Sequence, residues 1–198
     1  MIEKFIEEKG GIHHRFKRGY RNVINEAIRL NNAGQDCQLA METSGHGALK
    51  ENYFLDDGSY LATKLLIELA RGKKEGYTLE SLIADLAEPA ESVEFRFNIR
   101  LEEFKPYGLD VLDKLLAYAE TRPGWSIAPN NYEGVRVNLD KEHGDGWFLL
   151  RMSLHDPLMP LNIESDSKGG AKIIAQELAS FLMGWEKLDT AKFAAFVA

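Results

Sequence analysis

The first half of the chain alternates between helical and extended patterns of apolar residues. Apolar side chains recur every three or four positions in three segments, which are residues 1–8, 22–30 and a helix beginning after Asp56-Asp57-Gly58. The last of these places four leucines on one predicted inward face: Leu61, Leu65, Leu66 and Leu69. Residues 12–17 and 37–41 are predicted as strands between the helices. This order of elements predicts a layered α/β unit.

A different pattern begins after a short helix predicted over residues 78–86. Residues 93–99 alternate apolar and polar side chains, which predicts a half-buried strand. A helix over 109–119 follows, with five residues expected to face inward: Leu109, Leu112, Leu115, Leu116 and Ala119. Further strands are predicted over 132–139, 147–153 and 158–164, then a helix over 170–185 with an inward stripe of Ala171, Ile174, Ala175, Leu178 and Leu182. We therefore predict an antiparallel α+β unit and a domain boundary between residues 86 and 87.

Composition and charge narrow the class of protein. Hydrophobic residues make up 44% of the 198 residues and charged residues 28%, which is typical of a globular protein and excludes a disordered chain. The formal net charge of −7 argues against a broad surface for nucleic acid or anionic lipid. Neither a signal peptide nor a membrane span of roughly 20 apolar residues is expected. The single Cys37 excludes an internal disulfide, so a cytoplasmic location is expected.

Candidate chemistry gathers in the loop after the predicted strand 37–41. Glu42, Ser44 and His46 offer an acceptor, a hydroxyl that donates and accepts, and a ring that changes charge near neutral pH. This combination suits a polyhydroxyl ligand, and α/β sheets bind ligands at loops that follow strands. A polar turn without a ligand would use the same residues, so both interpretations stay open at this point.

A second candidate is Arg151 with Ser153, at the end of the predicted strand 147–153. A guanidinium matches phosphate oxygens, and the hydroxyl and turn N–H groups add donors. The alternative is an ion pair on a sheet edge. The basic segment 13–21 similarly fits either attraction of an anionic substrate or a solvated edge strand whose charges discourage pairing.

No metal site is predicted. The adjacent His13 and His14 would point to opposite faces of a strand, so they make a poor chelating pair. Asp56-Asp57 precedes an amphipathic helix, as helix-capping residues do. Residues 143–145 fall in a predicted hairpin turn.

Several of these segments together resemble one known family. Glu42-Thr43-Ser44-Gly45-His46 followed by Asp56-Asp57-Gly58 resembles the sugar-recognition loop and helix of the α-D-phosphohexomutases, which include phosphomannomutases and phosphoglucomutases. Residues 79–86 resemble the linker before the last domain of that family, and 133–136 and 146–157 resemble strands and the phosphate-binding loop of that domain. The resemblance implies a truncated three-layer α/β/α third domain over residues 1–86. It implies a TATA-binding-protein-like fourth domain, an antiparallel sheet with helices, over 87–198.

The resemblance implies that the first domain binds the sugar. Glu42 and Ser44 match residues that hold sugar hydroxyls, Gly45 shapes their loop and His46 lies beside it. Arg21 stands in place of a lysine in the turn that reaches the substrate.

The resemblance implies that the second domain binds phosphate. Arg151 and Ser153 match the first Arg and Ser of the family's Arg-x-Ser-Gly-Thr-x-Pro loop. Leu154 and His155 stand where Gly and Thr are usual, and His155 would supply a donor in place of the threonine.

The family interconverts hexose 1-phosphates and 6-phosphates through a bisphosphate, and therefore belongs to the isomerases. The resemblance implies that the phosphoserine and the magnesium loop belong to a half of the enzyme that this sequence lacks. No catalytic residue and no bound metal are therefore expected in this chain, whereas Mg²⁺ and a hexose 1,6-bisphosphate activator are expected for the full-length enzyme.

The expected partners are a hexose phosphate and the missing N-terminal half, with neither nucleic acid nor membrane. The chain alone is expected to be inactive. The alternative functions are a non-catalytic sugar-phosphate-binding or regulatory module and an inactive homologue of the mutases.

Overall fold

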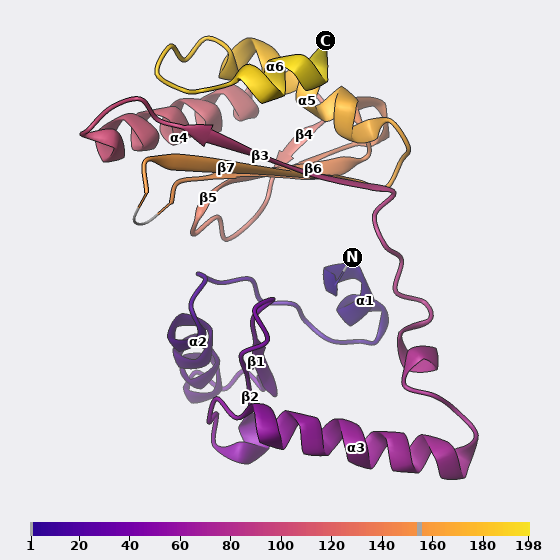
Figure 1. The fold of residues 1–198 in the computed structure, drawn as a ribbon. Helices are drawn as coiled ribbons and strands as arrows, with labels where there is room; N and C mark the ends of the chain where they lie inside the picture. The colour runs from indigo at the N-terminus through magenta and orange to yellow at the C-terminus, as the bar shows by residue number, and fades with distance from the viewer. Residues whose placement is uncertain (1, 154–155) are drawn as a thin grey trace. The chain divides into compact units, whose positions relative to one another are not determined.

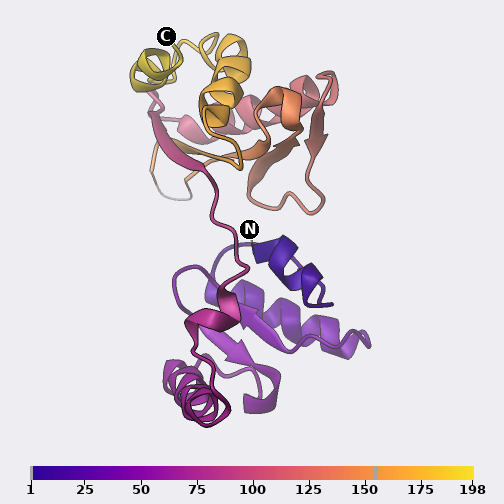
Figure 2. The ribbon, with the colours of Figure 1, turned by 90° about the vertical axis from the view of Figure 1, so that its right-hand side faces the viewer.

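A computed structural model describes residues 2–153 and 156–198 of the chain. The chain divides into two compact units, residues 1–87 and residues 88–198, which we describe one at a time. Figures 1 and 2 show the elements of both units from two directions.

The first unit combines helices with a short antiparallel hairpin. Its described elements are α1 (Ile2–Glu8), α2 (Tyr20–Asn32), β1 (Leu39–Met41), β2 (Gly47–Leu49), the 3-10 turn η1 (Lys50–Asn52), α3 (Gly58–Glu75) and the 3-10 turn η2 (Glu80–Ile83). In the hairpin, Ala40 pairs with Ala48. Helix α2 packs against β1, and α3 packs against β2. The helices predicted over 1–8, over 22–30 and after Asp57 are thus confirmed.

The strand predicted over residues 12–17 is wrong. This segment has no regular secondary structure and is held instead by its side chains. The His14 ring lies 2.9 Å from the Glu26 carboxylate, and Arg15 donates to Glu3 at 3.1 Å. These contacts link the segment to α2 and α1, and none of the described strands pairs with it. The short helix predicted over 78–86 is similarly reduced to η2.

The leucine face of α3, which the sequence predicts to point inward, is largely exposed. Leu65, Leu66 and Leu69 are 59%, 65% and 49% exposed. Of the residues of α3, all of which the structure describes, Gly72 is the buried one. The prediction of a buried leucine face is therefore corrected: the pattern is amphipathic, but the two-stranded hairpin covers only a small part of the apolar face.

The second unit is an antiparallel sheet with helices on one face. Its described elements are β3 (Glu91–Asn98), α4 (Phe104–Glu120), β4 (Trp125–Ile127), β5 (Gly134–Leu139), the 3-10 turn η3 (Lys141–His143), β6 (Gly146–Arg151), β7 (Leu158–Ser165), α5 (Gly170–Leu182) and α6 (Ala191–Val197). The strand order is β3-β7-β6-β5-β4, and every neighbouring pair is antiparallel. Figure 1 shows α4, α5 and α6 together on one side of this sheet. The predicted α+β architecture is confirmed.

The core of the second unit lies between the sheet and these helices. The predicted stripe of α5 is buried throughout, and it faces alternate residues of the central strands, such as Phe148, Leu150 and Ile163. On α4 the prediction is only partly correct, because Leu109 and Leu116 are exposed whereas Val111 and Leu115 are buried. The sequence analysis missed β4, which has three residues, and the terminal helix α6.

Two leucines of α4 provide a matched test of this core. Leu115→Ala removes a fully buried side chain, so we expect it to lower the free energy of unfolding of this unit by about 2–5 kcal/mol. Leu109→Ala, at a position 52% exposed in the same helix, is the control with an expected loss of about 1 kcal/mol or less. Urea denaturation measures both variants. Equal losses would contradict the assigned orientation of α4.

Candidate functional site

The loop between β1 and β2 presents the polar side chains that the sequence analysis singled out. The Glu42 N–H donates to the His46 carbonyl at 2.9 Å, and the Gly45 N–H donates to the Glu42 carbonyl at 3.0 Å. Gly45 has a φ of 95°, a conformation that residues with a side chain rarely adopt. The loop is therefore a tight turn, with Ser44 and His46 exposed on it.

The Glu42 carboxylate joins this loop to the start of α2. The Gly19 N–H donates to Glu42 Oε1 at 2.5 Å, and the Ser44 hydroxyl donates to Glu42 Oε2 at 3.2 Å. A carboxylate is favourable at this position because the first N–H groups of a helix carry partial positive charge. The contact brings Tyr20 and Arg21, which follow Gly19, to the loop.

Tyr20 and Asp56 both contact the ring of His46. The Tyr20 and His46 rings are stacked, with centroids 4.9 Å apart and an interplanar angle of 23°. The Asp56 carboxylate lies 2.7 Å from His46 Nδ1. Arg21 Nε donates to the Tyr20 hydroxyl at 3.1 Å. The structure thus gathers Arg21, Glu42, Ser44, Gly45 and His46 in one region of the first unit.

The sequence analysis missed Tyr20 and treated Asp56 and Asp57 alike. The structure separates the two carboxylates. Asp57 is the N-cap of α3 and accepts from the Tyr60 N–H at 2.9 Å, whereas Asp56 turns to the loop. The spacing between the loop and the Asp pair was visible in the sequence, but spacing alone does not tell which carboxylate caps the helix.

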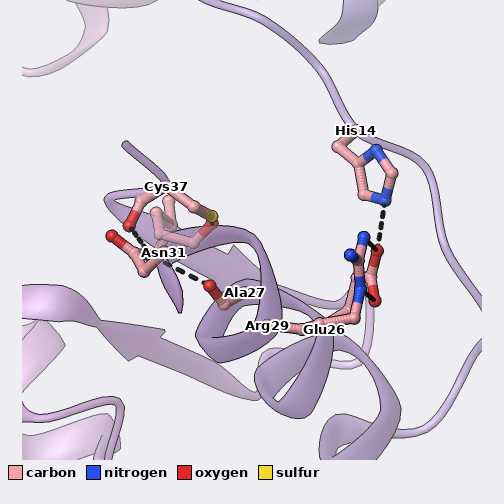
Figure 3. A network of polar contacts seen from close by, with 7 residues as sticks. His14, Glu26, Ala27, Arg29, Asn31 and Cys37 are labelled. Carbon is pink, nitrogen blue, oxygen red and sulfur yellow. Dashed lines mark hydrogen bonds and ion pairs between the residues drawn. The ribbon is translucent and has the colours of Figure 1, made fainter. Parts of the chain in front are cut away.

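A buried carboxylate fixes α2, whose first turn carries part of this region. Glu26 is 7% exposed, and Arg29 donates to its two oxygens at 2.8 Å each, while His14 approaches at 2.9 Å (Figure 3). The hydrogen bond from Arg29 is the main cause that lowers the pKa of Glu26. Asn31 donates to the carbonyls of Ala27 and Cys37 at 2.9 Å each and so ties the end of α2 to the segment before β1.

The second candidate group lies at the end of β6 in the second unit. Arg151 is the last residue of β6, and the strand alternation places it on the sheet face opposite to α4, α5 and α6. It pairs with Gly134, where a Cβ would come within 2.9 Å of the Arg151 Cβ. Gly134 therefore leaves room for the arginine on this face.

Arg151 also acts electrostatically on Glu94 of β3. Hydrogen bonds from Arg96 and Asn162 are the main causes that lower the pKa of Glu94, and the positive charge of Arg151 lowers it further.

Ser153 lies in the turn after this strand. Its N–H donates to the Leu158 carbonyl at 2.8 Å, and its hydroxyl accepts from the Asp156 N–H at 3.3 Å. The hydroxyl therefore stabilises the turn. His155, the third predicted phosphate ligand, lies outside the described residues together with Leu154.

The remaining described histidines lie beside acidic side chains. His143 Nδ1 lies 2.6 Å from Asp140, a contact that raises the pKa of His143. His14 pairs with Glu26, and His13 lies 3.9 Å from Glu3. Among residues 2–153 and 156–198, no cluster of three or more His, Cys, Asp or Glu is arranged to hold a metal ion. The helices described here include none with the length and apolarity needed to cross a membrane.

Comparison with known proteins places this geometry in a family. Residues 1–89 match the family model described as phosphoglucomutase/phosphomannomutase, alpha/beta/alpha domain III. A phosphoglucomutase of Neisseria meningitidis is 29% identical over 183 residues, which are 92% of this chain and 36% of that protein. A phosphomannomutase/phosphoglucomutase of Pseudomonas putida is 28% identical over 84% of this chain and 32% of its own length.

A solved structure extends the similarity over both units. It is a phosphoglucomutase/phosphomannomutase family protein from Burkholderia thailandensis, with a TM-score of 0.68 and 26% identity. The match covers 93% of this chain and 35% of the other. This chain thus spans about a third of the length of the relatives it matches. Residues 1–89 thus match domain III of the phosphoglucomutase/phosphomannomutase family, and the chain as a whole is similar to proteins of that family over most of its length.

Proposed function

We propose that this chain is the substrate-binding half of a hexose-phosphate mutase, which interconverts sugar 1-phosphates and 6-phosphates through a bisphosphate. The observation that carries the proposal is the convergence of Glu42, Ser44, His46 and Arg21 in a unit that matches domain III of the family. Because the chain spans about a third of its relatives, the phosphoserine and the magnesium loop are assigned to polypeptide outside it. We assign Mg²⁺ to that polypeptide as well, as the resemblance to the family implies.

The loop residues supply complementary hydrogen-bonding groups to a sugar. Each Glu42 oxygen accepts one hydrogen bond in the structure and has a further lone pair for a sugar hydroxyl. Ser44 both donates and accepts, and Arg21 adds a cation for a phosphate. Because sugar hydroxyls also donate and accept, these contacts serve a bound hexose in either of two orientations.

Arg151 and Ser153 are assigned to the phosphate that is not being transferred, with His155 as an additional donor. Phosphoryl transfer depends mainly on positioning and on stabilisation of charge. A guanidinium that stays charged at all physiological pH values is suited to this anchoring role. Glu94, whose pKa is lowered in part by Arg151, is a neighbouring anion with which a bound phosphate would compete.

The exposed face of α3 supports a further partner, the missing N-terminal half of the same enzyme. Leu65, Leu66, Ile67 and Leu69 are all exposed on this helix. Several large apolar side chains exposed along one helix favour a surface that another part of a protein covers. We assign that cover to the rest of the mutase, in the cytoplasm and without a role for nucleic acid or membrane.

The first prediction from the proposed function concerns the isolated chain. Purified protein is expected to bind glucose 6-phosphate or mannose 6-phosphate in an NMR titration, because both candidate groups are present. It is expected not to interconvert the 1-phosphates and 6-phosphates in a coupled assay. Measurable turnover would contradict the assignment of the catalytic groups to other polypeptide.

The alternative is a non-catalytic sugar-phosphate-binding or regulatory module, which would use the same binding residues without the catalytic groups. An antibody raised against the chain distinguishes the two functions in the source cell. A band much heavier than 22.3 kDa supports the mutase, whereas a band of this size supports the binding module.

The second prediction concerns Glu42. Glu42→Gln retains an oxygen that can accept from Gly19 but replaces the other acceptor by a donor and removes the charge. We expect the affinity for glucose 6-phosphate to fall about tenfold or more, the effect of losing a charged hydrogen-bond acceptor. Thr43→Ala, in the same exposed loop, is the control and should bind as the unchanged chain does. Equal affinities of both variants in calorimetry would refute the role of Glu42.

The third prediction concerns Arg151. Arg151→Ala is expected to weaken glucose 6-phosphate binding about tenfold while the affinity for unphosphorylated glucose stays unchanged, because the guanidinium contacts phosphate alone. Arg96→Ala removes an exposed arginine that donates to Glu94 on the edge strand and is the control. In the complete enzyme, Arg151→Ala should also lower mutase activity, and unchanged kinetics would exclude Arg151 from the phosphate site.

A further inference from the structure

His46 is held on two sides by residues that have no role in the proposed function so far. Asp56 lies against the edge of the ring at Nδ1, at 2.7 Å, and Tyr20 covers one face of the ring. The two residues come from different parts of the first unit, since Tyr20 begins α2 and Asp56 precedes α3. Contacts from two separate elements fix a ring more firmly than contacts from its own loop.

The Asp56 carboxylate is used through both of its oxygens. Oδ2 faces His46 Nδ1, and Oδ1 accepts from the Gly47 N–H at 3.3 Å. Asp56 also forms an isolated antiparallel bridge with Ala48. The carboxylate is therefore anchored to β2, the strand that follows His46, and its position relative to the ring is set by the backbone.

A carboxylate next to Nδ1 determines the tautomer of a neutral imidazole. An ionised carboxylate only accepts hydrogen bonds, so the ring nitrogen beside it must carry the proton. The other nitrogen, Nε2, then has a free lone pair. In the part of the chain that the structure describes, no hydrogen bond to His46 Nε2 is observed.

We propose that Asp56 is the positioning residue of His46, which it holds in the Nδ1–H tautomer so that Nε2 is presented to the ligand. Tyr20 sets the plane of the same ring through the stack. In neutral form, Nε2 accepts a hydrogen bond from a sugar hydroxyl, and after protonation the same nitrogen donates to an oxygen. The role of the ligand rests on the proposed function, whereas the tautomer does not.

The decisive measurement is the tautomer of His46 in the 198-residue chain. Long-range ¹H–¹⁵N spectra at about pH 8.5, above the ordinary imidazole pKa of about 6.5, distinguish the two neutral tautomers. We expect the Nδ1–H form for His46. Predominance of the Nε2–H form in the unchanged protein would overturn the proposal without any variant.

Asp56→Asn tests the cause. Asparagine replaces one of the two carboxylate oxygens by an NH₂ group that only donates, so its two terminal atoms cannot both accept, one from His46 and the other from Gly47. We expect loss of the pure Nδ1–H signal and an appearance of the Nε2–H form. Asp57→Asn is the matched control, because asparagine caps helices as well as aspartate and the observed hydrogen bonds of Asp57 go to Tyr60 and Asn52. An unchanged His46 spectrum in Asp56→Asn would refute the proposal.

Two further comparisons separate positioning from general disorder. The His143 ring, which pairs with Asp140 in the second unit, should keep its own signals in Asp56→Asn. Tyr20→Leu removes the stack but leaves Asp56 in place, so the Nδ1–H tautomer should persist in it. Loss of that tautomer in Tyr20→Leu would assign the control of the ring to Tyr20 and not to Asp56.

A sugar-phosphate titration of the same samples distinguishes this proposal from the proposed function. Asp56→Asn is expected to bind glucose 6-phosphate about threefold to tenfold more weakly, the change that follows from one hydrogen bond. If the tautomer is as expected but the unchanged chain binds no hexose phosphate, the proposed function fails and the positioning by Asp56 stands. If the unchanged chain binds hexose phosphate but His46 is in the Nε2–H form, the positioning by Asp56 fails and the proposed function stands.

Discussion

The arrangement of the candidate sugar site depends on one hydrogen bond, from the Gly19 N–H to the Glu42 carboxylate. It joins residues 23 positions apart, the start of α2 and the loop after β1. Together with the stack between the Tyr20 and His46 rings, it holds the first turn of α2 beside His46. The network around Glu26 supports this bond from the other side, because Arg29 and His14 hold α2 and the preceding basic segment together. Glu42 in the loop and the buried Glu26 in α2 therefore both fix the position of the first turn of α2.

The two units differ in how completely they bury their apolar residues. In the second unit, the sheet and the helices α4 and α5 enclose a continuous core with many fully buried side chains. In the first unit, the longest helix keeps most of its leucines exposed, and a two-stranded hairpin is too small to cover them. The family description of the matching region is an alpha/beta/alpha domain, in which helices lie on both faces of a sheet.

Most of the fold could be predicted from the sequence, and the failures have physical causes. Periodicity located the main helices and, apart from the three-residue β4, the strands of the second unit, because alternate residues of those strands face the core. The strand predicted over 12–17 failed since a local pattern does not reveal whether a pairing strand exists. For the site, the residue types of the loop indicated Glu42, Ser44 and His46. Tyr20 and Asp56 were not predicted, because their roles come from contacts of 26 and 10 positions in sequence separation that no local pattern encodes.

The proposed mutase activity would act on both ends of one sugar, and it would therefore need a site that tolerates two orientations of that sugar. The same residues must therefore be held in fixed positions and yet form hydrogen bonds with hydroxyls in either orientation of the sugar. The structure combines them in the first unit: Glu42 and His46 are fixed by neighbours, yet each keeps groups free for hydrogen bonding. A carboxylate accepts from any hydroxyl, a serine donates or accepts, and an imidazole changes its role with protonation. Ordering these side chains in advance reduces the entropy lost on binding, while their chemistry leaves the orientation of the ligand open.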